Sequence, residues 1–198
     1  MSAQDGSFDY SLSRVDIHPQ LFKEVTAQIS SDKKSPKQWS SKFFCATDEG
    51  DVIYSDWFAE VKADDKETGS RVESVLTGHH GPVADIHRSP FFPDILLTVG
   101  GWSFNIWREK QSSGSLLSGS MNQAYMTSCQ WSPTRPGLFF LGRSDGILEI
   151  WDLLDKCHAP SFTQTVSVSA ISFIRIQNYA GNLWLELRIF WFSICRNW

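Results

Sequence analysis

Short apolar runs alternate with turn-forming residues through the middle of the chain, from residue 78 to residue 152. One order of features is written twice there: a Ser-Pro turn, an apolar run, a turn containing Gly, and an Ile-Trp ending. The first copy reads GHHGPVADIHRSPFFPDILLTVGGWSFNIW and the second reads YMTSCQWSPTRPGLFFLGRSDGILEIWD. Short apolar runs bounded by turn residues are typical of β-strands. The two copies therefore predict a repeated set of strands joined by tight turns.

The spacing of the two copies indicates which kind of repeat they form. The Ser-Pro turns begin at residues 89 and 132, which are 43 residues apart, and the Ile-Trp endings begin at residues 106 and 150, which are 44 residues apart. A period of roughly 40 to 45 residues, with Gly-His near its start and Trp-Asp at its end, is typical of WD-type propeller blades. We therefore predict an all-β fold, a WD-repeat β-propeller.

The length of the chain limits how many blades it can hold. Propellers close with about 4 to 8 four-stranded blades, and we take the 198 residues of this chain to be too few for a closed ring. We expect an incomplete propeller of about two and a half to three blades. Such an arc is either a shortened piece of a longer protein or a unit that needs a partner for stability.

The strand pattern divides the chain into six segments. The stretch KFFCATDEGDVIY, which starts at residue 42, repeats the order of FFLGRSDGILEI in the second copy and predicts the end of an earlier blade. We expect a polar N-terminal segment and linker at 1–41, in which a short amphipathic helix fits after Pro19. The end of an earlier blade is expected at 42–58, WD blades at 71–107 and 116–152, and the start of a further blade at 161–173. An atypical aromatic tail is expected at 174–198.

The C-terminal tail departs from the repeat. A Ser-Pro turn is expected after Phe173, but the sequence that follows supplies neither this turn nor the remaining strands of the blade. The apolar stretch from Leu183 to Cys195 is short of the roughly 20 residues that span a bilayer, and Glu186 and Arg188 interrupt it. We therefore expect no membrane helix here, although the alternating apolar residues from Leu183 onward would also suit a strand.

Composition and charge narrow the classes of function. The chain is 41% hydrophobic and 20% charged, and its formal net charge of -4 gives no reason to expect a nucleic-acid partner. The N-terminus lacks the basic and then apolar order of a signal peptide. The four cysteines are far apart and form no CxxC pair. These features favour a reducing, intracellular compartment and no membrane partner.

No pattern of polar residues points to catalysis. His79, His80 and His87 with Cys129 have no spacing typical of a metal site, and Ser128 or Cys129 lies in no nucleophile motif. The chain has no HExxH, GxSxG or Gly-rich phosphate-binding motif. We therefore predict that the protein is not an enzyme and has no catalytic residues, metal or cofactor.

The repeat region resembles a known family. The HHGP entry at residue 79, the Gly101-Trp102 turn, the WSPTRPG stretch at residue 131 and Trp151-Asp152 are similar to the WD-repeat domain of dynein intermediate chains, of the axonemal inner-arm type. The resemblance covers residues 42 to about 173. It implies a non-catalytic subunit whose propeller docks on a dynein heavy chain and whose N-terminal region holds light chains.

The resemblance also implies a cellular setting. We expect a scaffold for inner dynein arms and ciliary motility, associated with heavy chain, light chains and another dynein intermediate chain. The expected location is the cytoplasm, the cytoskeleton and the axoneme of the cilium. The alternative is a generic cytosolic WD-repeat scaffold of some other protein complex.

Two groups of residues follow from the repeat. Residues in exposed turns are candidates for partner binding, unless they only stiffen those turns: His80, Trp102 and Arg135. Residues at repeat positions are expected to be structural: Gly78, His79, Trp107, Asp145, Gly146, Trp151 and Asp152. Each Trp ring is expected to fill the gap between adjacent blades, and Asp145-Gly146 predicts a hairpin turn. The WD pattern's bond from histidine to a turn aspartate is incomplete, because the turn residue is Gly101 in the copy that has His79.

Overall fold

The structure, a computed structural model, describes residues 10–17, 41–56, 72–111, 114–179, 182–189 and 192–197. This part of the chain forms fifteen strands and no helix. It therefore contains no helix long and apolar enough to cross a bilayer. The predicted all-β fold is confirmed. The helix expected after Pro19 lies outside the described residues.

The strands form four antiparallel sheets, each in chain order. The first contains β1 (Leu12–Ile17), β2 (Lys42–Thr47), β3 (Asp51–Asp56) and β4 (Val72–Thr77). The second contains β5 (Val83–Arg88), β6 (Ile95–Gly100), β7 (Ser103–Arg108) and β8 (Leu117–Ser118). The third contains β9 (Met126–Trp131), β10 (Leu138–Arg143), β11 (Ile147–Asp152) and β12 (Phe162–Thr165). The fourth contains β13 (Ile171–Tyr179), β14 (Asn182–Ile189) and β15 (Phe192–Asn197).

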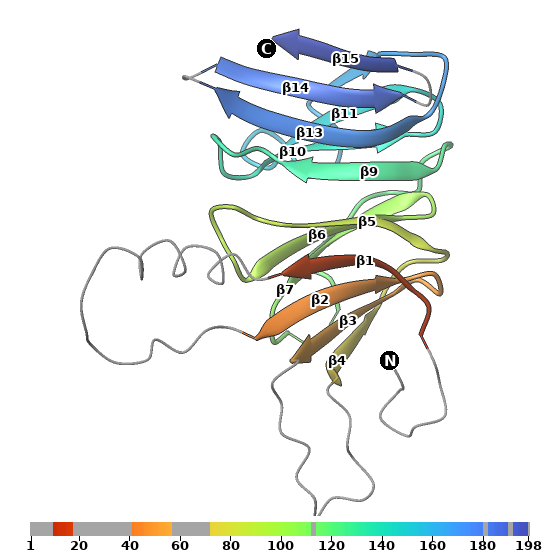
Figure 1. Ribbon diagram of the computed structural model, residues 1–198, viewed down its shortest axis with the longest axis vertical. Helices are drawn as coiled ribbons and strands as arrows, with labels where there is room; N and C mark the ends of the chain where they lie inside the picture. The colour runs from red at the N-terminus through yellow and green to blue at the C-terminus, as the bar shows by residue number, and fades with distance from the viewer. Residues whose placement is uncertain are drawn as a thin grey trace, which may run out of the picture.

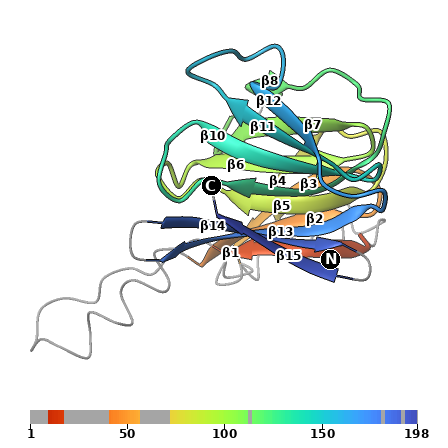
Figure 2. The same cartoon turned by 90° about the horizontal axis from the view of Figure 1, so that it is seen from above.

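The four sheets are arranged like propeller blades, with the first strand of each sheet next to the first strand of the following sheet. Strands β1, β5, β9 and β13 lie one above another in chain order, and Figure 1 looks onto them. From above, the outer strands β8 and β12 lie on the far side of the molecule from β1 and β13 (Figure 2). We call β1, β5, β9 and β13 the inner strands. Their arrangement is that of an open propeller arc.

Hydrogen bonds between sheets show that neighbouring inner strands run in the same direction. The backbone N–H of Cys129 donates to the Asp85 carboxylate at 3.0 Å, and indole Nε1 of Trp131 donates to the carbonyl of His87 at 3.1 Å. A step of two residues along β5, from Asp85 to His87, corresponds to a step of two residues along β9, from Cys129 to Trp131, so the two strands are parallel. The turns of the arc therefore lie on two faces, the entry face where the inner strands begin and the exit face where they end.

The sheets do not coincide with the ranges expected from the sequence repeat. Strand β1 comes from the segment expected to be a polar N-terminal region, and β4, within the expected blade at 71–107, completes the first sheet. The offset has a physical reason. Strand β1 reads LSRVDI and has no buried residue. Because no side chain of this strand has to be apolar, the sequence lacks the alternation of apolar and polar positions that would predict a strand.

The C-terminal region differs more clearly from the expectation of a tail without the remaining strands. Residues 174–198 contain the end of β13 and all of β14 and β15, which pair as a three-stranded antiparallel sheet. Three four-stranded sheets, followed by this three-stranded sheet, form an open arc, as expected for an incomplete propeller. Alternating leucines at 183, 185 and 187 already suited a strand. The absence of a Ser-Pro turn led to the wrong expectation for this region, because β13 pairs with β14 without such a turn.

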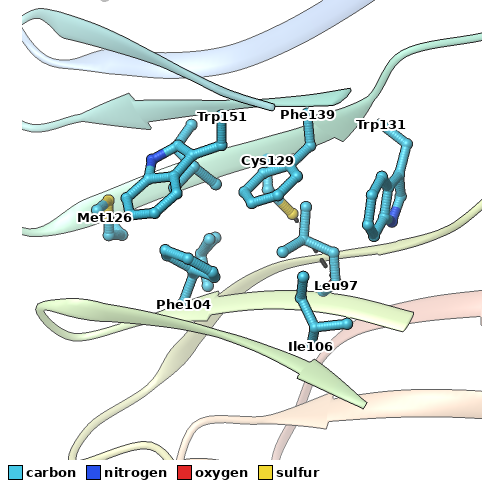
Figure 3. Close-up of a cluster of buried hydrophobic side chains, with 10 residues drawn as sticks. Leu97, Phe104, Ile106, Met126, Cys129, Trp131, Phe139 and Trp151 are labelled. Carbon is cyan, nitrogen blue, oxygen red and sulfur yellow. Dashed lines mark hydrogen bonds between the residues drawn. The ribbon is translucent and has the colours of Figure 1, made fainter. Parts of the chain in front are cut away.

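The core lies between the sheets. Between the first and second sheets the largest buried side chains are Phe44, Tyr54 and Trp107. Between the second and third sheets, Phe104 packs edge-on against Phe139 and Trp151, with ring centroids 5.3 and 4.8 Å apart (Figure 3). Such aromatic pairs add about 0.5 to 1.5 kcal/mol to the gain from buried area. Each sheet therefore depends on its neighbour for a closed apolar face.

Candidate functional site

The second sheet holds a buried hydrogen-bond network centred on Thr98. Indole Nε1 of Trp107 donates to the Thr98 hydroxyl at 2.8 Å, and Nε2 of His79 lies 2.7 Å from the same hydroxyl. The other ring nitrogen of His79 is 3.2 Å from the carbonyl of Gly100. All three side chains are buried. The network fastens the loop before β5 to β6 and β7.

Burial fixes the protonation state of His79. Removal from water lowers the pKa of His79 from 6.5 to about 4, although the bond to Gly100 acts in the opposite direction. The imidazole is therefore neutral near pH 7. Its neighbour Gly78 is required by packing, because a Cβ at this position would lie 2.5 Å from the Trp107 ring. These contacts are consistent with the structural role expected of both residues, which stays a prediction.

The third sheet holds its Trp in a different way. Leu141 of β10 pairs with Glu149 as Thr98 of β6 pairs with Asn105, and a leucine offers no hydroxyl at this position. Indole Nε1 of Trp151 donates instead to the buried carboxylate of Glu149 at 3.0 Å. Arg143 and Asn122 donate to the other oxygen of this carboxylate at 2.9 and 3.1 Å. We call this set the Glu149 network.

Arg143 closes the Glu149 network towards the turn. Burial alone would lower the pKa of Arg143, but its hydrogen bonds to Glu149 and Asp145 outweigh that effect and raise it. Asp145 thus binds an arginine in its own hairpin, and not a histidine. Gly146 follows with a φ of +77°, a conformation that only glycine adopts without strain. Sequence reasoning missed Glu149 and Arg143, whose charges in an apolar stretch were the available signal.

The partner-binding candidates lie on opposite faces of the arc. His80 precedes β5 and Trp102 lies in the β6–β7 turn, so both are on the entry face, where Val83 pairs with Gly100. Arg135 follows β9 and is on the exit face, where Trp131 pairs with Phe139. The structure therefore brings His80 and Trp102 to one side and separates them from Arg135.

Trp102 is part of an aromatic patch on the entry face. Its ring stacks on Tyr125 with centroids 4.5 Å apart, and Tyr125 is 52% exposed. The nearby Met121 is 66% exposed. We call Trp102, Tyr125, Met121 and His80 the entry-face patch. Tyr125 was not predicted as a site residue, because a single aromatic before a strand carries no signal of exposure.

Arg135 is tied to a repeat residue on the exit face. Its guanidinium lies 2.7 Å from the carboxylate of Asp152. The other oxygen of Asp152 accepts the backbone N–H of Leu154 at 3.0 Å and so shapes the turn after β11. The Arg135 side chain is nevertheless 56% exposed. It can therefore stiffen its turn and still offer donors to a partner.

The inner strands line a groove of about 440 Å³. Asp85 and His87 of β5 stand in its wall. Burial raises the pKa of the Asp85 carboxyl and lowers that of the His87 imidazole. The buried Cys129 thiol has a pKa well above its usual value because of burial, so it is no activated nucleophile. Within the described residues, no three His, Cys, Asp or Glu side chains are placed to hold a metal ion.

The sequence matches the family described as "Dynein axonemal intermediate chain 3 WD40 domain" over residues 5–182. It is 42% identical to dynein axonemal intermediate chain 3 of Mus musculus over 164 residues, which cover 81% of this chain and 17% of the mouse protein. It is 45% identical to the Homo sapiens protein of the same name over 139 residues, covering 68% of this chain and 15% of that protein.

A second type of intermediate chain is also similar. Dynein axonemal intermediate chain 2 of Homo sapiens is 35% identical over 138 residues, which cover 70% of this chain and 22% of the human protein. The chain thus spans less than a quarter of the length of these relatives.

Proposed function

The chain belongs to the family of the dynein axonemal intermediate chain 3 WD40 domain, and from this premise we propose that it acts as a non-catalytic scaffold in assembly of inner dynein arms. Its direct partner is a dynein heavy chain, and light chains and another dynein intermediate chain join the same complex. It works in the cytoplasm and cytoskeleton, in the axoneme of the cilium, and supports ciliary motility. The names of the relatives and the extent of the match support this proposal.

The entry-face patch is the observation that supports the proposal most directly, because it indicates which residues would contact the heavy chain. Residues that contribute most to binding at protein interfaces are enriched in Trp, Tyr and Arg, and an accessible aromatic pair with one exposed ring, Tyr125, and one half-buried ring, Trp102, suits such an anchor. The Trp102–Tyr125 stack is such a pair, and Met121 and His80 extend it. Hydrogen bonds hold the backbone of both residues, because the N–H of Asn122 donates to the Trp102 carbonyl and Tyr125 exchanges bonds with Ser144, and groups that are held before binding lose less conformational entropy. We place the heavy-chain contact on this patch.

Affinity capture from ciliary extract tests the proposal. The chain is compared with the double variant Trp102→Ala/Tyr125→Ala, and the mouse intermediate chain 3 serves as a positive control. The matched control is Phe91→Ala/Phe92→Ala, which removes two exposed aromatic rings from the exit face. We expect axonemal heavy chain with the parent chain and with the exit-face variant, and at least tenfold less with the entry-face variant. Thermal melts confirm that each variant is folded.

The alternative function predicts a different outcome of the same capture. A generic WD-repeat scaffold would recover other proteins and no axonemal heavy chain, while the mouse protein still recovers one. Arg135→Ala is included because Arg135 stays a candidate on the exit face. A loss of heavy chain with Arg135→Ala and none with the entry-face variant would move the contact to the exit face.

A further inference from the structure

The groove between the inner strands is built by all four sheets. Arg14 of β1 and Arg175 of β13 stand at its two sides, and Asp85 of β5 lies between them. The strands that contribute its lining, β1, β5, β9 and β13, face the viewer in Figure 1. Its volume of about 440 Å³ is within the range of roughly 300 to 1,000 Å³ that is typical of ligand sites. It is separate from the entry-face patch.

The acidic side chains of the groove are already engaged. The Asp85 carboxylate accepts the backbone N–H groups of Cys129 and Ile86, each at 3.0 Å. The Asp16 carboxylate is paired at 2.9 Å with the buried Arg88. These bonds differ in kind, because Arg88 neutralises the charge of Asp16, whereas the backbone N–H groups leave the charge of Asp85 to interact with Arg14 and Arg175. They also fix β1 and β9 against β5.

Within the part of the chain that the structure describes, the two groove arginines have no such close pairing, although both lie near enough to Asp85 to interact with its charge. Among the side chains that the structure describes, neither Arg14 nor Arg175 forms an ion pair. Arg14 donates only a long bond of 3.5 Å to the carbonyl of Ser13. The Arg175 guanidinium lies 5.0 Å from the centre of the Phe173 ring, a cation–π contact that holds it in place. Both side chains are exposed.

We propose that this groove binds an acidic peptide segment of a partner protein, with Arg14 and Arg175 receiving its carboxylates. Guanidinium groups bind carboxylates through two parallel hydrogen bonds, and a concave surface strengthens the attraction. A polyanion such as nucleic acid fits less well, because Asp85 and Asp16 lie between the arginines and the chain has a net charge of -4. Carboxylates spaced along a peptide can avoid these acids and reach each arginine.

Peptide titration tests the site without any dynein subunit, so its result is independent of the proposed scaffold function. The probe is a capped six-residue peptide of alternating Asp and Gly, and the comparison peptide has Asn in place of Asp. We expect binding of the Asp peptide only, weaker at higher ionic strength. Arg14→Gln and Arg175→Gln should each weaken it about tenfold, the usual effect of losing a charged hydrogen bond.

Three comparisons make the result decisive. Arg108→Gln removes the same charge from an exposed position outside the groove lining and should leave binding unchanged. Glu186→Gln removes the carboxylate at the position opposite Arg175 in the β13–β14 register and should bind at least as tightly. Equal binding of the Asn peptide, equal losses with Arg108→Gln, or weaker binding with Glu186→Gln would overturn the proposal. Inorganic phosphate binding as tightly as the peptide would overturn it too, since it indicates a general anion site.

Discussion

The second and third sheets place a Trp at the same repeat position and hold it with opposite chemistry. Trp107 donates to the hydroxyl of Thr98, which also contacts a neutral histidine. Trp151 donates to the carboxylate of Glu149, which an arginine neutralises. Both rings are almost fully buried between sheets. The repeat therefore specifies a buried Trp whose indole N–H needs a hydrogen-bond acceptor, but either a hydroxyl or a carboxylate can be that acceptor.

The choice of acceptor decides how each sheet responds to its surroundings. The neutral network of the second sheet fails when its histidine is protonated, because the buried ring must then take up a charge. The Glu149 network fails when one member of its ion pair is removed, because the other charge stays buried without a partner. Substitution of Trp107 or Trp151 measures the contribution of the buried ring to stability, which the two sheets share. Substitution in the His79 or Glu149 networks measures the contribution of the acceptor, in which the two sheets differ.

The largest expected effect concerns the shared feature. Trp151→Ala should reduce the free energy of unfolding by about 3 to 5 kcal/mol, as expected for an aromatic ring deleted from a core. The Trp151 ring packs against Phe104 of the neighbouring sheet and near Phe139 of its own. Urea denaturation measures the change, and Trp107→Ala should give a loss of similar size. A loss under about 1 kcal/mol at either position would mean that the ring is not a core element.

The Glu149 network provides the next largest effect. Arg143→Met should cost about 3 kcal/mol, because the Glu149 carboxylate keeps its burial and loses its cation. Arg108→Met is the matched control, since its ion pair with Asp94 is exposed and should contribute less than about 1 kcal/mol. Restoring stability with the double variant Arg143→Met/Glu149→Leu would confirm that the unpaired charge causes the loss. Equal, small losses in both arginine variants would contradict this account.

The pH dependence of stability tests the second sheet. The folded pKa of His79, about 4, lies below its usual value of 6.5, so the unfolded chain binds more protons in between. The contribution of His79 is therefore complete above pH 6.5 and is lost as the pH falls towards 4. The shift corresponds to about 3 kcal/mol. Urea denaturation of the parent chain and of His79→Gln between these pH values isolates this slope, and equal slopes would show that His79 does not titrate as described.

Much of the fold was predictable because its signals are local. Spacing of the Ser-Pro turns and of Trp107 and Trp151 gave the blade repeat, and Asp145-Gly146 gave a hairpin. Strand β1 could not be found in this way, because it lines a groove and buries no side chain. The strands after residue 173 were missed because the repeat's turn signal is absent there.

The candidate site was less predictable because it depends on which turns meet. The sequence places His80, Trp102 and Arg135 in turns, but only the strand directions assign the first two to one face and the third to the other. Tyr125 joins Trp102 through stacking between the second and third sheets. The groove needs residues from β1 and β13, which are more than 150 positions apart in the chain. Their role in binding stays a prediction.

The smallest expected effect is at the exit face, where the two sheets differ again. Arg135 pairs with Asp152 in the third sheet, whereas the matching turn of the second sheet carries the exposed Phe92. Because Arg135 is more than half exposed, Arg135→Ala should cost about 0.5 kcal/mol at low salt. The difference from the parent chain should vanish in about 1 M salt, where screening acts within roughly 3 Å. A loss of several kcal/mol that persists at high salt would make Arg135 a structural residue of the turn after β9 and weaken its standing as a partner contact.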